Sequence, residues 1–178
     1  MSGLLIAVVG PSGVGKDSVI RGLVDARPEI GWVRRAITRP PSDTEPFESV
    51  SEAEFDRRAA SGAFGLHWKA HGLRYGVPTA EIEAARAGAW RVVNLSRGVL
   101  AEADALAPLK VLSVTARPET IAARLSDRGR EGAQEIARRL ARRRPLPAGL
   151  DVTLLPNDGP LDETVAAVLA ALPQPVRG

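Results

Sequence analysis

The sequence predicts an α/β fold in which a parallel sheet carries helices on both faces. From Trp90 to Leu172, short apolar runs alternate with segments of helical periodicity, in the order strand, helix, strand, helix. Strands that alternate with helices pair in parallel, and their helices cover both faces of the sheet. An apolar run at residues 4–9 adds a further strand. Residues 34–80 break the alternation, and we expect them to fold over the carboxyl edge of the sheet.

Periodicity and flanking residues predict the individual elements of the chain. A helix follows the first strand, because the apolar positions within residues 19–24 repeat at helical spacing. Ser51 and Glu54 are spaced as a capping box, which predicts the start of a short helix. Residues 64–75 mix aromatic and basic side chains with glycine, which indicates a hairpin or irregular strands. Further strands are expected at 90–95, 110–115 and 152–155, and further helices at 78–88, 98–105, 118–128, 133–143 and 161–172.

The turn after the first strand has the glycine spacing of a phosphate-binding P-loop. Glycines allow consecutive backbone N–H groups to turn inward around an anion, and the next helix adds its positive N-terminal end. Lys16 supplies a mobile charge for the outer phosphates, so we assign it a catalytic role. The alternative is a glycine-rich turn that binds no ligand. The residues assigned to the nucleoside triphosphate are Gly10, Pro11, Ser12, Gly13, Val14, Gly15, Lys16, Asp17 and Ser18.

The residue after the P-loop lysine departs from the usual pattern. This position normally holds Ser or Thr, whose hydroxyl ligates magnesium, but here it is Asp17, with Ser18 beside it. Oxygen donors of either kind suit Mg²⁺. We therefore predict that Asp17 and Ser18 hold Mg²⁺.

Cations in residues 34–80 point to a second substrate that carries phosphate. The planar fork of arginine matches phosphate oxygens. The alternative is that part of this group consists of ordinary surface charges, and this alternative is weakest for Arg39 and Arg74. A phosphate acceptor is already an anion near neutral pH, because its second pKa is about 6, so no general base is required. The residues assigned here to the acceptor are Arg35, Arg39, Lys69, Arg74 and Tyr75.

A second group of arginines lies between residues 124 and 144. Arg128 and Arg130 lie at a predicted break, and Arg138 or Arg139 lies in the next predicted helix, as in a mobile lid that closes positive charge over a triphosphate. From this group we select Arg128 and Arg139. We assign both to catalysis. For residues 142–144 we favour a solvated basic helix face.

The composition excludes several classes of protein. The chain has 178 residues, of which 44% are hydrophobic and 25% charged, as in one globular domain. It has no apolar run of membrane-spanning length and no room for a signal peptide before the first strand, so we expect a cytoplasmic location. The absence of cysteine excludes disulfides and thiol nucleophiles. The net charge of +3 would suit nucleic acid as well as a substrate with several phosphates, but aromatic residues for base stacking are scarce at 4%. We expect a phosphorylated small molecule as substrate, and neither nucleic acid nor a membrane as partner. Monomer and homodimer both remain open.

Several motifs together resemble the guanylate kinase fold family. The resemblance covers nearly the whole chain and implies a single P-loop kinase domain. It implies a core of residues 1–33, 81–127 and 141–178, an acceptor-binding insert at about 34–80 and a short lid at about 128–140. It also implies that Asn157 lies near the adenine of ATP. The motifs are those at residues 10–16, 38–39, 75–76, 128–131, 139–140 and 157–158.

The chain departs from this family where guanine would be read. The matching positions carry Leu66 in place of Glu, Val77 in place of Ser or Thr, Phe47 in place of Tyr and Asn94 in place of Asp. A site built to hydrogen-bond guanine cannot lose those groups and remain selective. GMP is therefore not the expected acceptor.

A narrower family, the ribose 1,5-bisphosphate phosphokinases, resembles this chain at Asp17, Leu66 and Asn94, where the chain departs from the usual P-loop or guanylate kinase pattern. The resemblance implies formation of 5-phosphoribosyl 1-diphosphate (PRPP) from ATP in phosphonate metabolism, and it adds Arg97 to the acceptor site. Phe47 differs from this family, which usually has a His nearby. The alternatives are a guanylate or other nucleoside monophosphate kinase and a non-catalytic interaction module. The matching stretches are residues 15–18, 37–40, 66–76, 93–97 and 128–131.

Overall fold

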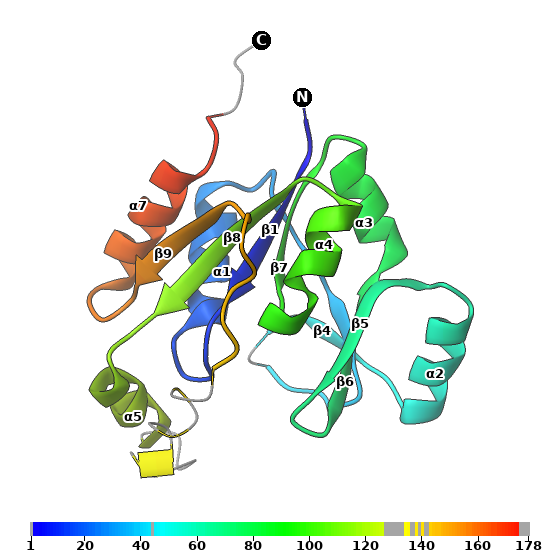
Figure 1. Cartoon of the computed structure of the whole chain (residues 1–178), viewed down its shortest axis with the longest axis horizontal. Coiled ribbons are helices and arrows are strands. Elements are labelled where there is room, and N and C mark those ends of the chain that lie inside the picture. Colours follow the sequence, from blue (N-terminus) through cyan, green and yellow to red (C-terminus); the bar gives the residue numbers. More distant parts are fainter. Residues whose placement is uncertain are drawn as a thin grey trace.

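The computed structural model describes residues 2–43, 45–126, 134–135, 138, 140 and 143–174. Five parallel strands form the central sheet, with the strand order β2-β7-β1-β8-β9 (Figure 1). The predicted α/β fold with a parallel sheet is confirmed. The strands are β1 (Leu4–Val9), β2 (Gly31–Trp32), β7 (Trp90–Asn94), β8 (Leu109–Thr115) and β9 (Val152–Pro156).

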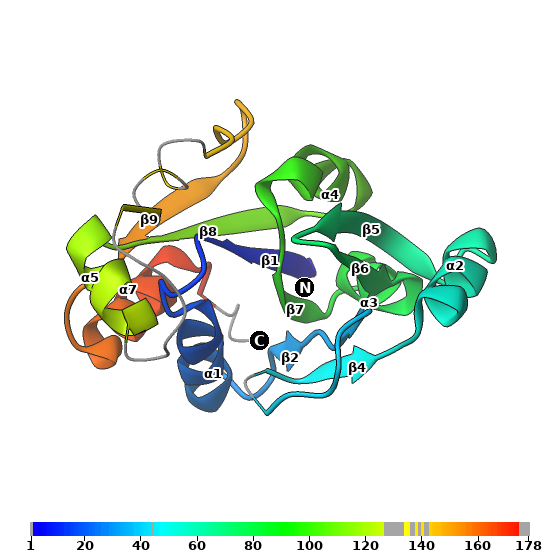
Figure 2. The same cartoon turned by 90° about the horizontal axis from the view of Figure 1, so that it is seen from below.

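Both faces of the central sheet are covered by helices. Side chains alternate along β1, so Leu5 and Ala7 pack into one apolar cluster while Ile6 and Val8 pack into another. The first cluster includes residues of α3 and α4, and the second includes residues of α1, α5 and α7. Figure 2 shows α1 and α7 below the sheet and α4 above it. The bounds are α1 (Lys16–Ala26), α3 (Thr79–Arg86), α4 (Leu100–Leu106), α5 (Pro118–Ser126) and α7 (Leu161–Ala171).

A second sheet lies within residues 34–80, beside the central one (Figure 2). Its strand order is β4-β3-β6-β5, in which β3 and β4 are parallel and the other pairs are antiparallel. β5 and β6 form the hairpin that the glycine pattern allowed. Ala36, Phe55 and Phe64 form a small apolar core under this sheet. The elements are β3 (Arg35–Ile37), β4 (Phe47–Ser49), α2 (Glu52–Ala60), β5 (Phe64–Ala70) and β6 (Leu73–Pro78).

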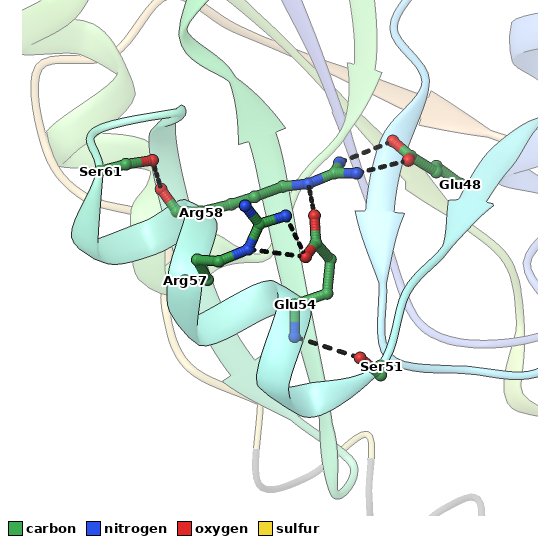
Figure 3. Close-up of polar contacts among 6 residues, drawn as sticks. All are labelled: Glu48, Ser51, Glu54, Arg57, Arg58 and Ser61. Carbon is green, nitrogen blue, oxygen red and sulfur yellow. Dashed lines mark hydrogen bonds and ion pairs between the residues drawn. The ribbon is translucent and has the colours of Figure 1, made fainter.

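Ion pairs attach α2 to this second sheet (Figure 3). The helix begins as predicted, with the Glu54 amide donating to Ser51 Oγ (3.1 Å). Arg58 forms a forked pair with Glu48 of β4, with N–O distances of 2.8 and 2.9 Å, and its Nε donates to Glu54 (2.7 Å). Arg57 also binds Glu54. These contacts lower the pKa of both carboxyl groups, because each carboxylate accepts hydrogen bonds from a guanidinium.

Two predicted helices differ from the structure or fall outside it. The segment predicted as a helix at 98–105 begins as a 3₁₀ turn, η1 (Arg97–Val99), before α4 starts. The predicted lid, and most of the helix predicted at 133–143, lie outside the described residues. Within the described ranges, no helix is long and apolar enough to cross a membrane.

Candidate functional site

A cleft of about 860 Å³ opens where β1 and β7 end, between the P-loop and the second sheet. Ligands of open parallel sheets bind at this carboxyl edge. The volume lies within the usual range of small-molecule sites. Besides residues of the P-loop, the cleft is lined by Arg35, Arg39, Glu45, Trp68, Lys69, Tyr75, Asn94, Arg97, Arg143 and Arg144.

The P-loop needs its glycines for both conformation and space. Gly13 and Gly15 have φ values of +82° and +95°, in the left-handed region that favours glycine. A Cβ on Gly13 would lie 2.8 Å from Leu125 Cγ, and one on Gly15 would lie 2.7 Å from Asn157 Nδ2. The loop is therefore packed closely against α5 and the residue after β9.

Lys16 lies under the loop with its charge poorly compensated. Its Nζ donates to the Gly10 carbonyl oxygen (2.7 Å). Burial, and next the charge of Arg35, lower the pKa of Lys16 to about 8. A phosphate at this point would stabilise the charged form of Lys16 and accept a charge-assisted hydrogen bond from it.

Asp17 carries an unsatisfied oxygen into the same cleft. Its Oδ1 is buried without a hydrogen-bond partner, and both Asp17 and Ser18 line the cleft. Burial, and next the repulsion of Glu45, raise the pKa of Asp17. A bound cation would favour its ionised form, so the residues fit a hard metal ion. The described residues hold no group of three or more His, Cys, Asp or Glu around a common point, so such an ion would also need oxygens from the substrate.

Glu45 joins two of the predicted acceptor arginines. Its carboxylate, only 8% exposed, accepts from Arg35 Nη2 (2.7 Å) and from Arg39 Nη2 (3.1 Å). Arg35 also donates to the Asn94 carbonyl oxygen (3.1 Å) and lies 5.2 Å from the ring centre of Tyr75. Both guanidinium groups are therefore fixed at the cleft. Glu45 was not predicted as a site residue, because a single acidic residue outside any predicted helix or strand carries no distinctive signal.

Arg97 and Arg143 are cations of the cleft that pair with no carboxylate in the described part of the chain. Arg97 Nη1 donates to the Arg144 carbonyl oxygen (3.0 Å), and Arg143 Nη2 is buried without a hydrogen-bond partner. Burial lowers the pKa of both groups, and the charge of Arg97 lowers that of Arg143 further. Such a pair is suited to a phosphate.

The solvated helix face expected for residues 142–144 is wrong for Arg143, which is partly buried. Arg143 lies outside any helix, so helical spacing gave no signal of its place at the cleft.

The structure brings most of the predicted acceptor residues to the cleft, but not Arg74. Neighbouring side chains of a strand point to opposite faces. Tyr75 faces the cleft, so Arg74 faces α2, where it forms an ion pair with Asp56. Arg35, Arg39 and Arg97 line the cleft as predicted, while Lys69 borders it as an exposed residue that pairs with Arg74 in the strand register. The two arginines assigned to catalysis, Arg128 and Arg139, lie outside the described residues.

Asn157 does not line the cleft either, because its side-chain amide is bonded to neighbouring residues. Nδ2 donates to the Val14 carbonyl oxygen (2.9 Å), and Oδ1 accepts from Thr164 Oγ1 (2.7 Å). Arg124 donates to the same Val14 oxygen (3.0 Å) and to the Asn157 carbonyl oxygen (2.6 Å). Asn157 is thus placed to support the P-loop.

Comparison with known proteins gives close relatives at the level of sequence. No model of a protein family matches the chain. A ribose 1,5-bisphosphate phosphokinase PhnN from Ruegeria sp. (strain TM1040) is 51% identical over 175 residues, covering 96% of this chain and 92% of the relative. Another PhnN, from Brucella melitensis biotype 2, is 42% identical over 173 residues, covering 94% and 90%.

A solved structure shows the same fold at lower identity. The crystal structure of guanylate kinase from Anaplasma phagocytophilum matches with a TM-score of 0.68 at 18% identity, over 94% of this chain and 82% of that one. At this identity the likeness concerns the fold alone.

Proposed function

This chain belongs to the ribose 1,5-bisphosphate phosphokinase PhnN family, and we propose that it transfers the γ-phosphoryl group of ATP to ribose 1,5-bisphosphate. The product is PRPP, which places the enzyme in PRPP biosynthesis and phosphonate metabolism. The observation that carries the proposal is the cleft itself, where a P-loop lysine faces a second group of cations.

The reaction needs positioning and positive charge more than proton transfer. An oxygen of the acceptor 1-phosphate attacks the γ-phosphorus, the bond to the β–γ bridging oxygen breaks, and ADP leaves with that electron pair. The attacking oxygen is already anionic near neutral pH. Arg35, Arg39, Lys69 and Tyr75 hold the acceptor in this scheme.

Cations at the P-loop side of the cleft bind the outer phosphates of ATP and the phosphoryl group that is transferred. Lys16 and the P-loop amides bind the outer phosphates of ATP. Arg97 and Arg143 bind the transferred group and stabilise the negative charge that develops on it. Neither guanidinium pairs with a described carboxylate in the free protein. A domain of about residues 34–80 for the acceptor, and a lid of about 128–140 carrying Arg128 and Arg139, complete this scheme.

Asp17 and Ser18 are the residues that would hold Mg²⁺. When bound, the ion neutralises part of the triphosphate charge. The buried free oxygen of Asp17 supports this assignment, and Asp17 takes the place that a hydroxyl residue has in other P-loops.

The alternatives have less support from the site. Leu66 and Val77 are fully buried and apolar, so they offer no hydrogen bond to guanine, which argues against a guanylate kinase. A non-catalytic interaction module has no need for Lys16, whose depressed pKa shows that its charge is costly in the free protein.

An ADP-release assay with three acceptors tests the proposal. We expect efficient turnover with ribose 1,5-bisphosphate, and little with GMP or ribose 5-phosphate. Comparable kcat/KM values for GMP and ribose 1,5-bisphosphate, or an advantage for GMP, would contradict the proposed function.

A further inference from the structure

One face of the β5–β6 hairpin forms the wall of the acceptor end of the cleft. Trp68 lies opposite Tyr75 in the strand register, and Leu66 lies opposite Val77. Because strand side chains alternate between faces, these four residues share one face of the hairpin. Trp68 and Tyr75 line the cleft, while Leu66 and Val77 are fully buried behind it.

The indole of Trp68 fills the space next to the tyrosine ring. The two rings are stacked, with centroids 5.4 Å apart and an interplanar angle of 7°. Trp68 also packs against the apolar cluster that contains Leu66, Val77 and Val99. The indole therefore occupies the face of the hairpin beside Tyr75, where a flat ligand could otherwise stack on the tyrosine ring.

We propose that Trp68 determines acceptor specificity by occupying the space that the base of a nucleoside monophosphate would need. Indole and purine share the same fused six- and five-membered ring outline, and either can stack on an aromatic ring. With the indole in place, an acceptor that lacks a base still reaches Arg35 and Arg39, which line the same cleft. This inference rests on the proposed function and adds the reason why the acceptor carries no base.

The experiment measures kcat/KM of wild type and variants with ribose 1,5-bisphosphate and with AMP, GMP, CMP and UMP. We expect Trp68→Ala to raise kcat/KM for the nucleoside monophosphates, relative to ribose 1,5-bisphosphate, by about tenfold or more, the scale on which apolar pockets discriminate by size. Trp68→Phe is the matched control. It keeps a ring stacked on Tyr75 and should keep the wild-type preference.

Three outcomes separate the possible failures. A folded Trp68→Ala protein that uses nucleoside monophosphates no better than wild type would overturn the proposal. If that variant is insoluble, Trp68→Leu keeps an apolar side chain but removes the bicyclic ring, and the same shift in preference is expected. An equal gain in Trp68→Phe, which keeps a ring stacked on Tyr75, would show that this stacked ring does not exclude the base and would also overturn the proposal. By contrast, wild type without activity on ribose 1,5-bisphosphate would contradict the proposed function, whatever the variants do.

Discussion

The arginines on α2 and two arginines of the cleft, Arg97 and Arg143, have opposite environments. On α2, Arg57 and Arg58 are matched by Glu54 and Glu48, so the charges of this group are compensated within the protein (Figure 3). In the cleft, Arg97, Arg143 and Lys16 form no ion pair with a described carboxylate, and burial lowers the pKa of each. The same residue type thus serves attachment in one region and leaves charge for a ligand in the other.

The two groups of arginines differ in how much their charges destabilise the free protein. Exposed ion pairs contribute about 0–1 kcal/mol each, so the α2 group can be altered at little cost. Buried cations without a partner destabilise the free protein, and a bound phosphate offsets that cost. Substitutions in the cleft should therefore affect activity strongly, whereas those on α2 should affect only stability.

The largest expected effect is that of Lys16→Ala. Removing this charge from the transition state should lower kcat by about 100-fold or more, as for other single groups that stabilise developing charge. The variant should be at least as stable as wild type, because a desolvated cation is lost. Steady-state kinetics and a thermal melt check both parts, and a folded variant with near wild-type kcat would contradict the P-loop assignment.

Arg143→Ala should have the next largest effect. A lost charge-assisted contact to the transferred group should lower kcat/KM by about 10- to 100-fold. Arg143→Lys keeps the charge without the fork and should recover part of the loss. Equal kcat/KM values for Arg143→Ala and wild type would show that the unpaired guanidinium does not act on the substrate.

Glu45→Gln tests the carboxylate that pairs with Arg35 and Arg39 at the cleft. A neutral amide cannot hold both Arg35 and Arg39 as firmly, so KM for the acceptor should rise by about tenfold while KM for ATP changes little. The melting temperature should fall, because the buried guanidinium of Arg35 and the partly buried one of Arg39 lose their counter-charge. Glu48→Gln, from the α2 group, is the control and should leave both KM values unchanged.

The lowered pKa of Lys16 predicts a pH dependence of nucleotide binding. In the free protein Lys16 loses its proton near pH 8, and a triphosphate binds the charged form. The Kd of a non-hydrolysable ATP analogue should therefore be constant below pH 8 and rise above it, up to about tenfold per pH unit. Calorimetric titration at several pH values measures this. In Lys16→Arg the rise should be absent, and its persistence there would assign the titration to another group.

The smallest effect is expected for Arg58→Ala. This substitution removes the forked pair with Glu48 and the contact to Glu54, and it should lower the unfolding free energy only slightly, because water and salt screen exposed ion pairs. Denaturant unfolding measures the cost, and kcat/KM should equal that of wild type. A large loss of activity would contradict the separation between the two groups of arginines.

The sequence predicts the central sheet and the P-loop well, because both depend on local patterns. Glycine spacing and apolar periodicity are properties of short segments, and the strand and helix positions around them agree with the structure. The side that each cation faces depends on the pairing of distant strands. Arg74 and Tyr75 are adjacent and therefore cannot share a face, yet only the position of α2 shows which of them turns away from the cleft. Glu45 and Arg143 join the site through contacts that no local pattern encodes.

The position of the transferred phosphoryl group tests the central claim most directly. Phosphorus NMR of the product formed from ATP and ribose 1,5-bisphosphate distinguishes a diphosphate, whose two phosphorus nuclei couple, from an added phosphate monoester. We predict a sugar product with one coupled diphosphate pair and one uncoupled 5-phosphate signal, formed in step with ADP. A product with three uncoupled phosphate signals, or no product from this acceptor, would contradict the account.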